Sequence, residues 1–433
     1  MPWKYVMPHD ADSLRHREAT LSRIIQFWEE FAHTAPQIDA HLAGTAPEFE
    51  LAPWMNERVH AIHPRLRWEF GQDLAGGGGR YLVITCEHAH HLRPMVETVV
   101  RRAPEIPGWS FREFRVSREP EEIPPLVRAR TGHVMGTTTV QAKMGHHRQI
   151  DFVFQSLLGG SNEDAAMDVA LAAGDYLIGE DVMHRWGGHI DVVGMAHALT
   201  ASFVPLARVR SIVLDLIAGV LSVLPDRPFW KMPPLAQIEV KLRPQRQEEY
   251  AGQEDAMFGT TVIPELREAS VSPGFCSCRF SRQGETFVHL KLDASDVGLE
   301  ERYKRKKMIE EAMDSELREG GIGAVVGTAT GRKYLHFDLA VVDVVKTLEA
   351  TRRRLLALEV LPVKSWLLFY DADLRGEYIG LRSATPKPPL WTEPVEQVPV
   401  RNTDRVRIPT ALREPSPDHG SLDAPNWMVD PLH

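Results

Sequence analysis

The sequence contains few of the residues on which several classes of protein depend. It has three cysteines in 433 residues, which excludes a scaffold held together by several disulfides. The longest candidate membrane segment, Ile212–Leu224, is shorter than the roughly 20 apolar residues that a spanning helix needs. The first residues, Met1–Ser13, contain no apolar signal core, which argues against secretion. We therefore expect a cytoplasmic protein without a membrane partner.

Positive charge is not in excess either. Lys and Arg number 50 against 59 Asp and Glu, which gives a net charge of −9. This balance disfavours generic nucleic-acid binding through a basic surface. The basic runs Arg302–Lys307 and Arg352–Arg354 fall on predicted helices and are typical of solvated helix faces. The composition, 43% hydrophobic and 25% charged, is that of a globular protein, and the length suffices for two or three domains.

No complete catalytic motif is present. Four consecutive glycines, Gly76–Gly79, precede a predicted strand, whereas a phosphate-binding P-loop opens a helix. Gly321, Gly323 and Gly327 have spacing loosely similar to a dinucleotide fingerprint, but a strand-like run follows where the fingerprint needs a helix. Both stretches are therefore interpreted as parts of hairpins.

The most informative stretch is Arg80–Val116. Tyr81–Thr85 is a short apolar and β-branched run, which predicts a strand buried on both faces at the centre of its sheet. A polar corner follows, and then Leu92–Ala103 has apolar residues at helical spacing. Trp109–Val116 predicts a second strand, so the unit is a strand, a helix and a strand.

The pattern of the whole chain predicts an α+β fold. Hairpins alternate with two helices in each half of the sequence, which favours two split β-α-β (ferredoxin-like) antiparallel sandwich domains. A proline-rich shift follows the apolar helix Ile212–Leu224 and indicates a linker between them. The predicted parts are an N-terminal domain at 12–203, a helical and proline-rich linker at 204–254, a C-terminal domain at 255–382, and an extended or disordered tail at 383–433.

The polar corner after the first strand carries a possible metal site. Thiolate and neutral imidazole are ligands that zinc prefers, and residues two apart can face the same way in an extended chain. A structural zinc site also needs ligands from a distant segment, which His146, His147, His184 and His189 could supply, although nothing in the sequence fixes their position. The alternative is a polar helix N-terminus at which the helix dipole favours Glu87. The candidate ligands are Cys86, His88, His90 and His91.

Two weaker candidates lie in the C-terminal half. Cys276 and Cys278 would place two thiols on one strand face, and we interpret them as small residues packing inward, with redox or metal chemistry as the alternative. A cluster of polar residues follows the glycine-containing hairpin and predicts an anion-binding site, although an exposed mixed strand has the same pattern. This cluster consists of Arg332, Lys333, Tyr334 and His336.

Several segments resemble known bacterial domains. In the first half, a strand, a helix, an Ala-Pro break and a Gly-Trp strand resemble a bacterial α+β family of unknown function; the segments are Trp68-Glu69, RYLVITCEHAHHLRPMVETVVRRAP, GWSFREFR and YLIGE. The second half, with TATGRKYLHFDLAVVD and SWLLFYD, resembles domains related to the ribonuclease-E regulator B type. The resemblance covers Trp28–Val193 and Asp255–Leu381, rests on packing residues, and implies no catalytic residue.

The favoured hypothesis is a non-catalytic cytoplasmic binding or regulatory protein of bacterial type. It would act through contacts with another protein and use no cofactor. One alternative is a metal-dependent enzyme, with zinc at Cys86–His91. Another is a sensor that binds a small ligand in a cleft between its domains. The residues do not decide the partner, the substrate or the oligomeric state.

Overall fold

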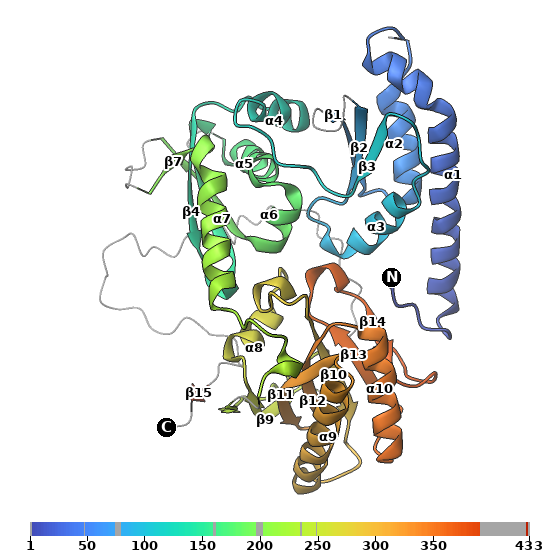
Figure 1. The fold of residues 1–433 in the computed structure, drawn as a ribbon, viewed down its shortest axis with the longest axis vertical. Coiled ribbons are helices and arrows are strands. Elements are labelled where there is room, and N and C mark those ends of the chain that lie inside the picture. The colour runs from blue at the N-terminus through green and yellow to red at the C-terminus, as the bar shows by residue number, and fades with distance from the viewer. Residues whose placement is uncertain are drawn as a thin grey trace. The chain divides into compact units, whose positions relative to one another are not determined.

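The computed structural model describes residues 2–46, 48–73, 79–158, 162–195, 202–233, 236–247, 249–389 and 430–431. These residues form an α+β protein, and their contacts divide it into two units (Figure 1). The first unit contains the residues up to Ala142 together with Val153–Ser211. The second contains Lys143–Phe152 and the described residues from Ile212 onward. Within the described ranges, no helix has both the length and the apolar character that crossing a membrane requires.

The first sheet of the first unit is built around the predicted central strand. Strand β2 (Gly79–Thr85) lies between β1 (Arg67–Asp73), which runs antiparallel to it, and β3 (Trp109–Arg112), which runs parallel. Leu82 and Val83 have no exposed surface, so the prediction of a strand buried on both faces is confirmed. The connection to β3 is a 3-10 turn (His90–Leu92) and helix α3 (Arg93–Arg101), which begins with a proline in its first turn, where no hydrogen bond is lost.

Two further helices form the apolar core of this sheet. Helix α1 (Ala11–Leu42) is capped by the carboxylate of Asp10, and α2 (Leu51–Ile62) contacts it. Phe27, Trp28 and Phe31 recur on one face of α1 and their rings contact one another. The rings of Trp28 and Phe31 also lie edge-on to Phe111 of β3. The indole of Trp28 donates to the backbone oxygen of Val99 at 2.7 Å, which satisfies its only polar group inside the core.

A second sheet, most of whose residues belong to the first unit, has the strand order β6-β5-β4-β7. Its strands are β4 (Thr138–Met144), β5 (Ile150–Ser156), β6 (Gly187–Gly194) and β7 (Val204–Pro205). Helices α4 (Ile123–Thr131), α5 (Glu163–Ile178) and α6 (Glu180–Trp186) belong to the same part. This half therefore differs from the single antiparallel sandwich that the sequence predicts. The local pattern indicated the strands, but it does not specify which of them share a sheet.

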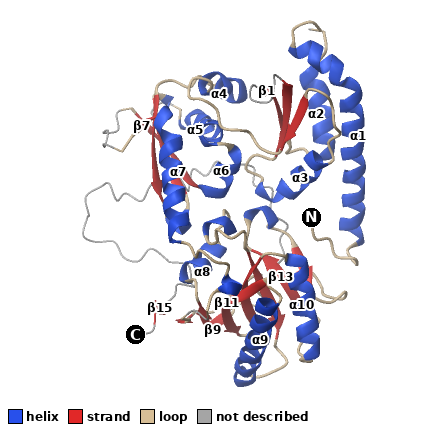
Figure 2. Cartoon of the chain, in the orientation of Figure 1, coloured by secondary structure: helices blue, strands red, loops and turns tan. Residues whose placement is uncertain are grey.

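The second unit contains one antiparallel sheet with the order β14-β13-β10-β12-β11-β9-β8-β15. Along the chain, β10 (Thr286–Asp293), α9 (Leu299–Glu319), β11 (Gly323–Gly331), β12 (Tyr334–Val341), α10 (Val344–Ala357) and β13 (Ser365–Phe369) follow one another. Strand β14 (Tyr378–Gly380) extends one edge, and β9 (Ala256–Thr261), β8 (Ile238–Lys241) and the short β15 (Asp430–Pro431) extend the other. Helices α9 and α10 lie side by side against this sheet (Figure 2).

The two faces of this sheet differ in chemistry. Leu290 of β10 pairs with Phe337 of β12, which in turn pairs with Thr328 of β11, and this is the face that α9 covers. The alternate residues His289 and Lys291 point to the other face because successive strand side chains alternate. Segment 249–255 crosses that second face, since the backbone oxygens of Tyr250 and Ala251 accept hydrogen bonds from the Lys291 amine.

The predicted linker and tail can be placed only in part. Within 204–254 the structure has helix α7 (Leu206–Val223) and strand β8, which joins the sheet of the second unit. Helix α8 (Pro264–Ser270) follows this segment. Of the predicted tail at 383–433, most residues lie outside those that the structure describes.

Shortening a buried side chain of β2 tests the central position of that strand. Ile84 is 1% exposed, and we expect Ile84→Ala to lower the free energy of unfolding by about 2–5 kcal/mol, because transfer energy is lost and a cavity remains. The matched control is Ile25→Ala on α1, whose side chain is exposed, with an expected loss of under about 1 kcal/mol. Urea denaturation measures both, and equal losses would move β2 out of the core.

Candidate functional site

A cluster of buried charged side chains lies in the first unit, and we call it the arginine–carboxylate cluster. Its members come from six different elements or connections of the unit, from β1 to α6. Strand β1, the corner after β2 and the segment after β3 contribute one residue each, and α4, α5 and α6 contribute the others. The members are Glu69, Glu87, Arg115, Arg130, Asp175 and Glu180.

Arg115 is the centre of this cluster. Its Nε donates to Glu69 at 2.9 Å, and its Nη2 donates to Glu87 at 3.0 Å. Glu180 approaches the third guanidinium nitrogen at 3.6 Å and also accepts the backbone N–H of Arg115 at 3.0 Å. The side chain of Arg115 is 4% exposed. Because a charge without solvent is costly unless it is paired, these carboxylates have to be present for Arg115 to be buried.

The second guanidinium extends the cluster to α5. Arg130 donates to Asp175 at 2.8 Å and lies 3.1 Å from Glu87. Four carboxylates thus surround two guanidiniums. Burial raises the pKa of Glu180, and the nearby Asp175 raises it further. For Glu87, burial acts to raise the pKa, but Arg130 and Arg115 outweigh it and the pKa is lowered.

The predicted metal ligands surround one member of this cluster. Cys86 is buried in the apolar core of the first sheet. Glu87 follows with a φ of 48°, a conformation rare for non-glycine residues, and its N–H donates to the hydroxyl of Thr85. His88 and His91 are half-buried. Among the described residues, Cys86, His88, His90 and His91 do not bring three ligand atoms within 4.8 Å of one another.

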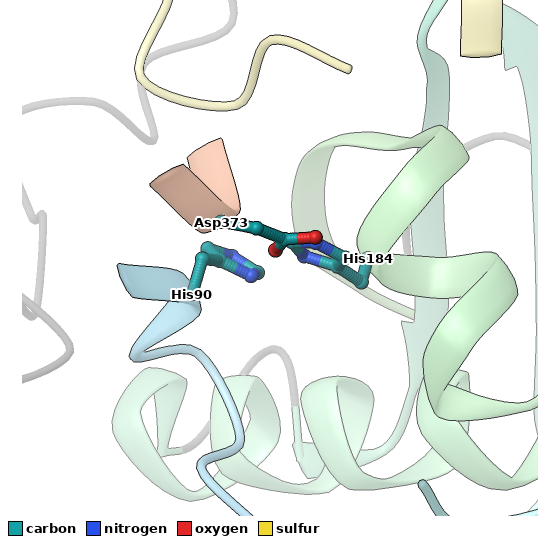
Figure 3. A group of neighbouring side chains, drawn as sticks. All are labelled: His90, His184 and Asp373. Atoms are coloured by element: carbon teal, nitrogen blue, oxygen red, sulfur yellow. The ribbon is translucent and has the colours of Figure 1, made fainter. Parts of the chain in front are cut away.

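His90 instead stacks on a histidine that the sequence left unplaced. The ring centres of His90 and His184 are 4.1 Å apart (Figure 3). Burial lowers the pKa of His90 well below its ordinary value, and the neighbouring His184 contributes. The ring is therefore neutral and able to act as a ligand. Asp373, the third labelled residue of Figure 3, lies in the 3-10 turn Ala372–Leu374 of the second unit.

The second unit has a chain of hydrogen-bonded side chains on the sheet face opposite α9. His289 of β10 and His336 of β12 lie with their facing nitrogens 3.2 Å apart. The other nitrogen of His336 is 2.7 Å from Asp255, and the other nitrogen of His289 is 2.9 Å from Gln253. Asp338 accepts from Tyr370 at 2.5 Å and from Gln253 at 2.8 Å.

Nδ1 of His289 lies among several polar groups. The amide nitrogen of Gln253 is 2.9 Å away, the hydroxyl of Tyr370 3.2 Å and the carboxylate of Asp338 3.3 Å. Burial lowers the pKa of His289 to about 4, so the ring is neutral at pH 7. Its Nε2 faces Nδ1 of His336, and Nε2 of His336 faces Asp255.

The predicted anion site is part of this same region, and a carboxylate of the protein occupies it. Asp255 accepts the backbone N–H groups of Lys333 at 2.8 Å and Tyr334 at 3.0 Å, in addition to His336. These bonds lower the pKa of Asp255 to about 2, against the opposing effect of burial. The backbone N–H of Arg332 donates to the Asp255 carbonyl oxygen. The four predicted residues therefore gather around an anion, and that anion is Asp255.

A groove of about 580 Å³ lies on the other face of the same sheet. It forms where β8 and β9 extend the sheet beyond β11, next to α9. At its floor, the buried amine of Lys306 donates to Thr328 at 3.0 Å and lies 3.5 Å from Glu310. Exposed side chains line its rim: Gln237, Glu239, Tyr303, Lys307, Glu311 and Ser315.

Sequence reasoning missed most of these groups. His289 and Lys291 carried a usable signal, because two polar residues alternate with apolar ones in a strand that is otherwise buried. Arg115, Asp175 and Glu180 had no such signal. Their partners are up to 65 residues away along the chain, as in the bond from the Arg115 N–H to Glu180.

The fold and these clusters define an α+β protein in which several buried charges form paired clusters and whose second unit has an open charged groove. No protein family, no curated protein and no solved structure matches this chain.

Removing the central guanidinium tests the role of the arginine–carboxylate cluster. We expect Arg115→Met to lower the free energy of unfolding by about 3–5 kcal/mol, because several buried carboxylates lose their counter-charge. Arg101→Met is the control, since Arg101 forms only an exposed ion pair with Glu97 at 3.8 Å and should cost under about 1 kcal/mol. Thermal and urea melts measure both, and a cost for Arg115→Met no greater than the control would contradict this role.

The low pKa of His289 predicts how stability depends on pH. The unfolded ring binds a proton near pH 6.5, whereas the folded ring does so only near pH 4. Between these values the unfolded state binds more protons, so the stability present above pH 6.5 is lost as the pH falls, by up to about 1.4 kcal/mol per pH unit. His289→Gln should remove this part of the slope. Parallel slopes of wild type and variant between pH 6.5 and 4 would refute the assignment.

Proposed function

We propose that this chain is a non-catalytic, cytoplasmic binding protein that regulates a partner protein, and that the partner binds in the groove beside α9. The observation that carries the proposal is the groove itself. It is open to solvent, charged at its rim, and built on a rigid helix and a sheet. Its volume of about 580 Å³ is in the range of ligand sites, but its exposed and polar rim suits a polypeptide segment better than an enclosed small molecule.

The strand order of the second unit supports the fold that this proposal assumes. The order β13-β10-β12-β11, with α9 and α10 as the two crossings, supports a split β-α-β (ferredoxin-like) sandwich. We propose on this basis, and on the segments quoted above, that the unit is of the ribonuclease-E regulator B type. Strands β8 and β9 would then be additions that create the groove.

The buried polar cluster of the second unit also supports a non-catalytic role. His289, His336 and Asp255 are each at most 1% exposed, and their hydrogen-bonding atoms bind one another. A catalytic acid or base has to come within hydrogen-bond distance of a substrate atom. In this structure other side chains of the protein occupy the hydrogen-bonding positions of both imidazoles, so the His289–His336 pair is a structural element of the sheet.

The rim charges indicate the chemistry of the partner segment. Glu239 on β8 and Glu311 on α9 are acidic and exposed, and they line the groove together with one exposed basic side chain of its rim, Lys307. Tyr303 is 56% exposed at the rim, and Phe258 is 48% exposed on the neighbouring strand β9. Opposite charges steer and orient a partner, and exposed aromatic rings provide apolar contact area. The fitting segment is therefore extended, with a basic side chain beside an apolar one.

Charge reversal on both walls of the groove tests this function. In affinity purification from bacterial lysate with the full chain, Glu239→Lys combined with Glu311→Lys should lose a partner that wild type retains. The dissociation constant for that purified partner should rise at least about tenfold, because like charges then face each other.

The control carries the same change of charge elsewhere on α9. Glu301→Lys with Glu319→Lys reverses two exposed carboxylates that do not line the groove, and it should keep the partner. A partner retained equally by the groove variant would place its site elsewhere. If all three proteins captured no specific partner, the binding function itself would be wrong.

A further inference from the structure

Two cysteine sulfurs approach each other closely in the second unit. Cys276 and Cys278 are two residues apart, both half-buried, and their Sγ atoms are 3.0 Å apart. The sequence interpretation had them packing inward as small residues. A disulfide has a sulfur–sulfur distance of about 2.05 Å, so about 1 Å of movement separates this pair from a covalent bond.

The residue between the cysteines is held firmly. The backbone N–H of Ser277 donates to Asp371 at 2.6 Å, and the Ser277 hydroxyl donates to the other oxygen of the same carboxylate at 2.5 Å. The hydroxyl oxygen also accepts the backbone N–H of Phe287, at the start of β10, at 2.9 Å. These three bonds hold the turn that carries both thiols against β10 and the segment after β13, so the sulfurs stay close together.

A buried cation lies next to the thiols. Arg279 has no exposed surface, and its charge acts on Cys276, Cys278 and Asp371. Its Nη2 donates to the backbone oxygen of Gly274, while Nε and Nη1 are buried without a hydrogen-bond acceptor among the described residues. A buried guanidinium favours an anion beside it, and the groups that can supply one here are the Asp371 carboxylate and a thiolate.

We propose that Cys276 and Cys278 form a reversible dithiol–disulfide pair, a redox modification site in the second unit. The two sulfurs share a hydrogen bond in which either can be the donor, and this bond and burial raise the pKa of the Cys276 thiol. Cys278 is therefore the thiolate that reacts first, with Arg279 as its counter-charge. Cys276 is the thiol that closes the disulfide.

The reaction balances with a hydroperoxide as the oxidant. The Cys278 thiolate attacks one peroxide oxygen, the O–O bond breaks, and the alkoxide or hydroxide that leaves takes up a proton. The resulting sulfenic acid is attacked by the Cys276 sulfur, the S–O bond breaks, and water leaves with the proton of the Cys276 thiol. Two electrons pass from the two sulfurs to the peroxide. A dithiol reductant reverses the change by exchange.

The pair lies where its oxidation changes the fold locally. Closing the bond alters the peptide of Ser277, which donates to Asp371, and removes the thiolate that Arg279 favours. Burial raises the pKa of Asp371 to about 6, so this carboxylate depends on the Ser277 bonds for its charge. The site is independent of the groove and of the partner proposed above.

Mass spectrometry of the full chain tests the proposal directly. Native protein is treated with hydrogen peroxide in slight excess, its thiols are alkylated in denaturant, and the protein is cleaved after arginine. Both cysteines lie in the peptide Glu268–Arg279. We expect this peptide to carry no alkyl group and to be lighter by two hydrogens than the reduced peptide. Dithiothreitol, added before alkylation, should fully restore the alkylation of both cysteines. Cys86 should be alkylated with or without this reduction. Alkylation of both cysteines after the treatment would overturn the proposal, as would a disulfide between two chains.

Two comparisons separate the native geometry from general thiol reactivity. In the native chain the disulfide should form at least about tenfold faster than in the urea-unfolded chain, because the fold holds the thiols together. Arg279→Lys should retain most of this rate, and Arg279→Met should slow it at least about threefold. Equal rates in the native and unfolded chains would show that the structure contributes nothing and would refute the site. Circular dichroism establishes that each variant is folded.

Discussion

Both units depend on one constraint: charged groups that folding removes from water have to be paired. Arg115 is the clearest case, because its guanidinium is almost completely buried and three carboxylates from separate elements contact it. Neither the guanidinium nor the carboxylates are stable in this position alone, since each would lose its hydration without compensation. The elements that carry them have to assemble together. The cluster therefore specifies how β1, the corner after β2 and α6 are arranged within the first unit.

Asp255 has the same role in the second unit. It accepts two backbone N–H groups and one imidazole, so a residue before β9 holds the turn between β11 and β12. Its bond to His336 continues through His289 to Gln253, whose amide nitrogen also donates to Asp338. A polar network of this kind favours one arrangement of the strands, because a shift leaves buried polar atoms without partners.

The opposite face of that sheet is open at one end for a geometric reason. Helices α9 and α10 cover the strands that they connect. Strands β8 and β9 extend the sheet, but the chain between them adds no helix to this face. Glu239 and Thr260 therefore remain at the groove. The polar network on one face and the groove on the other have different roles: the network stabilises the sheet, and the groove offers binding surface on it. The cysteine pair lies at a third place, in a turn that Asp371 holds.

The sequence alone determined the local structure of several segments. Tyr81–Thr85 was predictable as a buried central strand. Its apolar run is short and unbroken, so neither face of the strand carries the polar residues that a face exposed to water would need. The alternation of helices and strands after Asp255 was also predictable, because the spacing of apolar residues differs between helices and strands. Which strands share a sheet was decided by the tertiary structure, and so were the partners of Arg115 and the anion at Lys333 and Tyr334. Those contacts join residues that are far apart in the chain, as with the 78 positions between Asp255 and Lys333. Periodicity reports only the side of an element that is buried, whereas the identity of the group on that side depends on how all the elements pack.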